Sequence, residues 1–167
     1  IEPGDWSSDV CSSDLFNGRI IVIFSEKETD KAVEYLMKSK ILGVDTETRP
    51  SFKKGKMHQV SLLQISTYDT CFLFRLNRIG LTDSLVKLLE DRQTTKVGLS
   101  LQDDLRQLNQ RRAFTPGAYI ELQKEVKEIG IEDMSLQKIY ANLFGEKIAK
   151  SQQLSNWEAE TLSEAQQ

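Results

Sequence analysis

Most of the chain consists of short apolar runs and of segments in which apolar residues recur with the period of an α-helix. Runs rich in Ile, Val, Leu and Phe predict strands at 19–24, 41–44, 60–66, 71–76, 97–99 and 119–122. Apolar residues spaced three and four apart predict helices whose buried faces lie within 32–37, 81–89, 101–108 and 136–144. Strands cluster early and then alternate with helices. This order predicts an α/β domain with a central mixed β-sheet flanked by helices.

The first fifteen residues show neither the helical nor the strand period of apolar residues. They contain no Lys or Arg, so they are neither a secretory signal nor a transit peptide. Residues 5–15 read Asp-Trp-Ser-Ser-Asp-Val-Cys-Ser-Ser-Asp-Leu. That is, residue for residue, the translation of the end of a common short-read sequencing adapter. We therefore expect residues 1–15 to be a non-native tail and residues 16–167 to form one domain. A source gene with different codons in this segment would contradict the hypothesis.

The composition fits a globular chain, with 39% hydrophobic and 28% charged residues. No apolar run approaches the ~20 residues of a membrane-spanning helix, so we expect no membrane partner and a cytoplasmic location. The net charge of -3 argues against a nucleic-acid partner. However, residues 1–15 hold four acidic residues and no basic ones. Without them the count is 22 basic against 25 - 4 = 21 acidic residues, or +1, and the objection disappears.

Several kinds of site are excluded by residue counts. The chain has one histidine, His58, and two cysteines, Cys11 and Cys71. These numbers cannot supply a histidine-rich metal site, a disulfide framework or a zinc site built from cysteines. No glycine-rich phosphate loop of the Walker type occurs, so we expect no use of ATP.

Two carboxylates follow the predicted buried strand 41–44 directly. Side chains two apart on a strand share a face, so Asp45 and Glu47 should project together, with Cβ atoms ~7 Å apart. Their charges repel unless cations compensate them, and carboxylate oxygens suit Mg²⁺ and Mn²⁺. The spacing alone is also compatible with two solvated charges at a strand end.

A third carboxylate, Asp104, lies on the apolar stripe of the helix predicted over 101–108. Ser100 and Asp103 have the spacing of a helix start, which places Asp104 in the first turn, where the helix dipole favours an ionised acid. Asp104 is either a buried acid satisfied by hydrogen-bond donors or a ligand for a cation. Two acids on a strand and one at a helix start fit two-metal phosphoryl hydrolysis.

These acids lie in segments that resemble the DEDD superfamily of 3′–5′ exonucleases, and most of all ribonuclease D and the Werner-type exonuclease domain. The matching segments are 43–48 (Gly-Val-Asp-Thr-Glu-Thr), 63–65 (Leu-Gln-Ile), 97–104 (Val-Gly-Leu-Ser-Leu-Gln-Asp-Asp), 134–137 (Met-Ser-Leu-Gln) and 155–157 (Ser-Asn-Trp). The resemblance implies a ribonuclease H-like fold. It also implies hydrolysis of single nucleotides from a 3′ end with two Mg²⁺ or Mn²⁺ ions.

The resemblance assigns roles to individual residues. Asp45 would bridge the two metals, Glu47 would hold one of them and meet the terminal 3′ hydroxyl, and Asp104 would help to hold the second. Thr46 and Thr48 would lie against the terminal nucleotide, Thr46 through its backbone.

One family motif has no counterpart. A Tyr-x-x-x-Asp pair should follow the Ser-Asn-Trp segment, but no such pair occurs among the 167 residues. The expectation is a truncated fragment of an active parent protein, itself inactive or severely impaired. Two alternatives stay open at this point: a module of the same fold that binds 3′ ends without cutting them, and a plain α/β interaction domain whose acids are structural.

A basic loop follows the Asp-x-Glu strand. It holds Arg49, Lys53, Lys54, Lys56 and His58. It is either an ordinary solvated loop or a contact to the nucleic-acid backbone, and Lys53 and Lys54 are the residues we expect to make that contact. The expected partner is a single-stranded or 3′-end nucleic acid, RNA or DNA.

Overall fold

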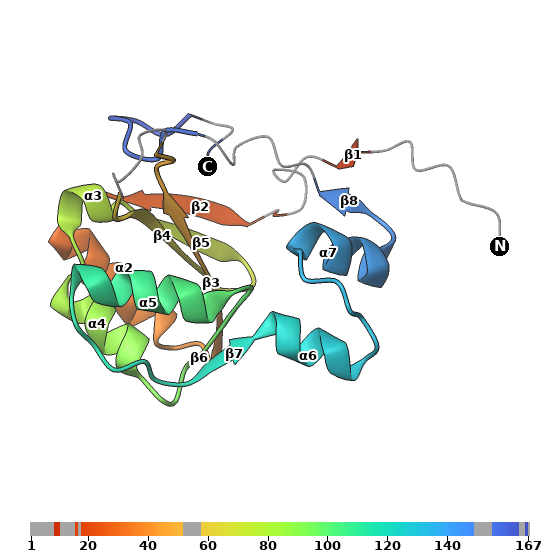
Figure 1. The fold of residues 1–167 in the computed structure, drawn as a ribbon. Helices are drawn as coiled ribbons and strands as arrows, with labels where there is room; N and C mark the ends of the chain where they lie inside the picture. The colour runs from red at the N-terminus through yellow and green to blue at the C-terminus, as the bar shows by residue number, and fades with distance from the viewer. Residues whose placement is uncertain are drawn as a thin grey trace.

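The computed structural model describes residues 9–10, 16, 18–51, 58–148, 155–163 and 166. Its centre is a six-stranded sheet (Figure 1), and β4 is antiparallel to both of its neighbours while the other pairs are parallel. The order across the sheet is β2 (Arg19–Ile23), β5 (Thr70–Phe74), β4 (Val60–Ser66), β3 (Ile41–Thr48), β6 (Thr95–Gly98) and β7 (Tyr119–Glu121). The predicted mixed sheet is therefore confirmed, with β3 near its middle.

Three helices cover one face of this sheet (Figure 1): α2 (Glu26–Leu36), α4 (Asp83–Glu90) and α5 (Leu101–Arg111). Their apolar stripes are the predicted ones and pack with Val44, Leu63, Ile65 and Phe72 in one core. A capping box formed by Ser25 and Glu28 begins α2. Burial of these stripes is what holds the helices on the sheet.

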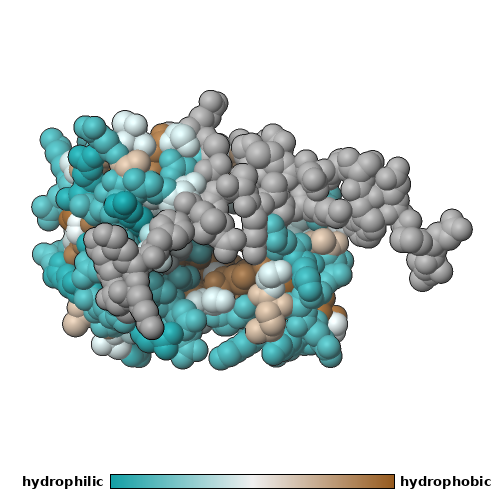
Figure 2. All heavy atoms as spheres, turned by 45° about the horizontal axis from the view of Figure 1, so that its top comes forward, coloured by the Kyte–Doolittle hydropathy of each residue, from teal (hydrophilic) through white to brown (hydrophobic). Residues whose placement is uncertain are grey.

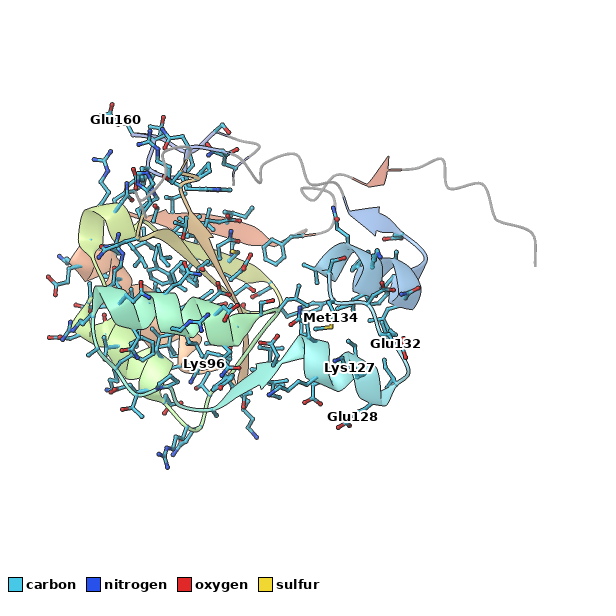
Figure 3. All side chains as sticks on the ribbon, in the orientation of Figure 1. Lys96, Lys127, Glu128, Glu132, Met134 and Glu160 are labelled. Carbon is cyan, nitrogen blue, oxygen red and sulfur yellow. The ribbon has the colours of Figure 1, made fainter. Side chains whose placement is uncertain are left out.

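The second face of the sheet is covered by a segment from the far end of the chain. Trp157 and Leu162 are 3% and 7% exposed and pack against Leu62 of β4 and Leu73 of β5. Fully buried Arg75 donates from Nη2 to the carbonyl of Ala159. Arg78 Nη2 donates to the carbonyl of Glu160 over 3.3 Å, and Figure 3 shows Glu160 beside helix α3 (Leu76–Ile79). Residues 155–163 are thus an integral layer of the fold, and packing explains the burial of Trp157.

Two further helices, α6 (Leu122–Glu128) and α7 (Leu136–Phe144), lie beyond β7 and to one side of the sheet (Figure 1). Helix α7 ends at Gly145, which adopts the left-handed φ of 74° that favours glycine. The apolar face predicted for α7 is only partly buried: Ile139 is buried, but Leu136, Leu143 and Phe144 are exposed. Figure 2 shows hydrophobic atoms on this part of an otherwise mostly hydrophilic surface.

Several predicted strand boundaries were wrong, including that of β6, which was predicted at 97–99. Strand β3 continues to Thr48, four residues beyond the apolar run, because it pairs with β4 along this length. Strand β5 ends at Phe74, and α3 starts at Leu76. Leu122 begins α6 instead of ending a strand. In each case backbone pairing or helix formation decided the boundary, and apolar content did not.

The segment predicted to be a non-native tail lies mostly outside the described residues. Within it, Asp9–Val10 forms a two-residue strand, β1, parallel to β8 (Lys147–Ile148). No helix among the described residues is long and apolar enough to cross a membrane.

Candidate active site

Asp45 and Glu47 lie inside strand β3, on the sheet face opposite the three helices. The register places Asp45 across from Gln64 and Glu47 across from Leu62, which belongs to that second face. The two acids share a face, as strand alternation predicts. A register shift between Glu47 and Thr48 ends this alternation immediately afterwards. The acids are therefore within the paired strand, whereas the apolar run alone had predicted them just beyond its end.

Asp104 approaches β3 from the other side. It lies in the first turn of α5, and its Oδ1 accepts a hydrogen bond of 2.7 Å from the Thr46 hydroxyl. Thr46 lies between Asp45 and Glu47 on the strand and, by alternation, points to the helix face. The structure thus brings the three predicted acids to one stretch of β3, with Thr46 as the direct link to Asp104.

All three acids have a raised pKa. Partial desolvation is the main cause for each, although the Asp45 side chain is still exposed to solvent. The pKa of Glu47 rises to about 7, with the charges of Asp45 and Asp104 adding to desolvation. The pKa of Asp104 rises to about 6, although the Thr46 hydrogen bond lowers it. The pKa of Asp45 is raised as well. Among the residues that the structure describes, none of these three carboxylates forms a salt bridge with a basic side chain.

These residues fit a divalent cation by their chemistry. Three neighbouring carboxylates with raised pKa values are what a Mg²⁺ or Mn²⁺ ion would stabilise in ionised form. Among the described residues, however, no three His, Cys, Asp or Glu side chains are grouped closely enough to hold one ion. One physical reason is that Asp104 is engaged by Thr46 on the helix face.

Sequence reasoning missed Glu121, the last residue of β7. Its Oε1 accepts from the Ser100 N–H over 2.6 Å, and its Oε2 accepts from the Gln102 N–H over 3.4 Å. The helix start predicted at Ser100 is confirmed, but the Ser100 side chain makes no cap hydrogen bond, and Glu121 takes its place. No local pattern could reveal the substitute, since Glu121 lies 21 residues from Ser100.

The basic loop is only partly described. Arg49 and His58, at its two ends, both pair with Glu158, at 3.1 and 3.2 Å. Desolvation raises the pKa of Glu158, but the hydrogen bonds from Arg49 and His58 and the charge of Arg49 lower it overall. Lys53, Lys54 and Lys56 lie outside the described residues. Thr48, half-buried at the end of β3, is the remaining predicted contact to nucleic acid.

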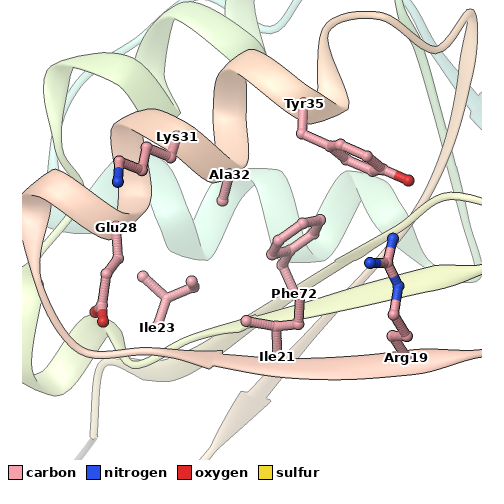
Figure 4. A pocket seen from close by; sticks show the side chains of 8 residues that line it. All are labelled: Arg19, Ile21, Ile23, Glu28, Lys31, Ala32, Tyr35 and Phe72. Carbon is pink, nitrogen blue, oxygen red and sulfur yellow. The ribbon is translucent and has the colours of Figure 1, made fainter.

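The acids are not in the concave groove shown in Figure 4. That groove, of 270 Å³, lies between edge strand β2 and helix α2. Its lining includes Ile21, Ala32, Tyr35 and Phe72 but none of the three acids. We place the candidate site at the carboxylates, because titratable groups that perturb one another mark chemistry more directly than an apolar hollow does.

Comparison with known proteins identifies the family. A family model described as 3′–5′ exonuclease matches residues 20–167. DNA polymerase I of Aquifex aeolicus is 32% identical over 144 residues, which are 86% of this chain and 23% of the polymerase. This chain spans at most 35% of the length of such curated relatives.

Solved structures share the fold. The exonuclease domain of Aedes aegypti Nibbler has a TM-score of 0.79 at 18% identity, covering 89% of this chain and 78% of that one. Trypanosoma brucei RNase D in complex with RNA U12 has a TM-score of 0.77 at 18% identity, covering 92% and 58%. The expected ribonuclease H-like fold is confirmed. With this fold and the family match over residues 20–167, the chain belongs to the 3′–5′ exonucleases of the DEDD superfamily.

Proposed function

We propose that the protein from which this chain comes removes nucleotides from the 3′ end of a nucleic acid by two-metal-ion hydrolysis. The observation that carries the proposal is the set of three carboxylates at β3 and α5 whose pKa values are all raised. Such a set lowers the stability of the metal-free protein, which is typical of a functional site. In a 3′–5′ exonuclease the function of these carboxylates would be to hold cations. Two Mg²⁺ or Mn²⁺ ions would, when bound, polarise the scissile phosphate and activate water.

Each residue of the candidate site would have a role that follows from its position. Asp45 and Glu47 face the same side of β3, where they would hold cations and, for Glu47, the terminal 3′ hydroxyl. Asp104 would join them from α5 once it is released from Thr46. The backbone of Thr46, and Thr48 beside it, would lie against the terminal nucleotide. Lys53 and Lys54 would contact its phosphates.

RNA is a reasonable substrate class to test first, because the similar RNase D of Trypanosoma brucei was solved with RNA. The experiment uses 5′-labelled single strands of RNA and of DNA, each ending in a 3′ hydroxyl or a 3′ phosphate. Binding is measured in Ca²⁺ and product formation in Mn²⁺. We expect tighter binding of the hydroxyl-ended strand and a loss of that preference in Glu47→Gln. Equal binding of both ends would contradict the proposal.

A second candidate is a module that binds 3′ ends without cutting them. The observation that favours it is the lack of any Tyr-x-x-x-Asp pair in the 167 residues. We propose accordingly that these 167 residues alone bind 3′ ends but turn over little or no substrate. Robust Mn²⁺-dependent release of nucleotides by this chain would refute that part.

A further inference from the structure

The turn between β6 and α5 determines where Asp104 lies. Only Leu99 and Ser100 separate the end of β6 from the start of the helix. Ser100 adopts φ 56° and ψ 28°, and among the described residues it alone combines a positive φ with a side chain. Left-handed backbone is unfavourable for serine, so surrounding contacts must hold it.

This turn is also tightly packed against β3. A Cβ added at Gly98 would lie 2.5 Å from the carbonyl oxygen of Val44, the residue before Asp45. The end of β6 is thus packed directly on β3 beside the candidate site. A shift of the helix start would therefore move Asp104 relative to Asp45 and Thr46.

Glu121 provides hydrogen bonds that hold this turn. Strand β7 pairs with β6 so that Glu121 lies opposite Gly98. From there its carboxylate accepts from the N–H groups of Ser100 and Gln102, at 2.6 and 3.4 Å. Helix starts leave such donors unsatisfied, and a negative charge beside them is favourable. Glu121 thus caps the N–H groups at the start of α5, which the Ser100 side chain leaves uncapped.

We propose that Glu121 is a positioning residue for Asp104, which it serves by holding the first turn of α5 from the neighbouring strand. Its role here is that of a hydrogen-bond acceptor, since each of its oxygens accepts from a backbone donor of the helix start. The part of this inference that concerns a metal rests on the proposed function; the hold on the helix does not.

The test compares Glu121→Gln with Glu125→Gln, an equal loss of charge at an exposed residue of α6. The glutamine keeps the shape of Glu121 but has only one acceptor oxygen, so one of the two N–H bonds is lost. Amide hydrogen exchange is followed without metal over residues 100–104 and, for reference, over α2. Mn²⁺ affinity is measured on the same proteins by calorimetric titration.

We expect about tenfold faster exchange at the start of α5 in Glu121→Gln, unchanged exchange in α2, and Mn²⁺ binding weakened several-fold. Glu121→Asp, which keeps both oxygens, should recover part of each effect and serves instead if the glutamine variant does not fold. Exchange equal to that of Glu125→Gln would overturn the inference. So would faster exchange with unchanged Mn²⁺ affinity. A wild-type chain that binds no Mn²⁺ would contradict the proposed function, while the exchange measurement still decides whether Glu121 holds the helix.

Discussion

The Thr46 hydroxyl donates a hydrogen bond of 2.7 Å to Asp104 Oδ1 and so joins the central strand to the helix that carries the third acid. Thr46 lies between two carboxylates that point to the other face of the sheet. The bond therefore fixes how the acids of the two faces are placed. It also partly offsets the desolvation that raises the pKa of Asp104.

Replacing Thr46 with valine should raise the pKa of Asp104 above its present value of about 6, because the donor that favours the ionised acid is gone. The free energy of unfolding should fall by about 1–2 kcal/mol at pH 8, where Asp104 is charged. NMR titration of the carboxyl carbon and urea unfolding measure the two effects. Thr46→Ser keeps the hydroxyl and should change neither; an unchanged pKa in the valine variant would show that the bond is not formed in solution.

The metal-free protein should lose stability as pH rises from about 4.5 to about 7. Glu47 has its pKa raised from 4.5 to about 7, so in this window the folded state binds more protons than the unfolded state. Asp104, raised from 3.8 to about 6, acts with the same sign. Glu47→Gln should remove on the order of 1–2 kcal/mol of this dependence, allowing for the partial exposure of the side chain.

Urea unfolding at pH 5, 6, 7 and 8 follows this effect, with Glu34→Gln on the exposed side of α2 as the control. A stability that rises over this pH range in the wild-type chain, and equally in Glu47→Gln, would contradict the raised pKa.

Divalent cations should stabilise the protein at pH 8, which lies above the pKa of about 7 of Glu47 and of about 6 of Asp104. Mn²⁺ at a hundred times its dissociation constant should add about 2.7 kcal/mol, because it binds the folded state alone. Chelation with EDTA should reverse the gain. Asp45→Asn should lose most of it, whereas Asp103→Asn, on the exposed side of α5, should keep it. A thermal midpoint that does not respond to Mn²⁺ would argue against the metal site.

Trp157→Ala should cost about 3–5 kcal/mol of stability, since the indole is 3% exposed and fills the layer over Leu62 and Leu73. Tyr68→Ala, at a fully exposed ring, is the matched control and should change little. The measurement is equilibrium denaturation followed by far-UV circular dichroism. A loss below about 1 kcal/mol would mean that residues 155–163 are not a stable layer of the fold.

Reversing the charge of Lys53 and Lys54 together should weaken the binding of single strands and reduce the slope of affinity against salt by about 2, one for each phosphate that the loop no longer neutralises. Lys27→Glu with Lys38→Glu, two exposed residues of the α2 region on the helix side of the sheet, makes the same charge change elsewhere. Fluorescence anisotropy at several salt concentrations separates the two. Equal slopes in the two double variants would remove the loop from the proposed interface.

The sequence by itself determined the six strands of the central sheet and the helices α2, α4, α5 and α7, but it did not indicate α3 or α6. Alternation placed Asp45 and Glu47 on one face of a strand, and the helix-start spacing of Ser100 and Asp103 placed Asp104 in the first turn of α5. Both patterns depend only on local backbone geometry. The motifs around these acids were enough to point to the exonuclease superfamily.

Only the tertiary structure decided how the acids meet and what supports them. Strand β3 extends past its apolar run because β4 pairs with it, and Thr46 bonds Asp104 across 58 residues. Glu121 reaches the start of α5 only because β7 lies beside β6, and Trp157 is buried only because Leu62 and Leu73 leave a face to cover. Each of these contacts joins residues far apart in the chain, and local preference carries no information about which distant backbone donor or apolar face a side chain will find.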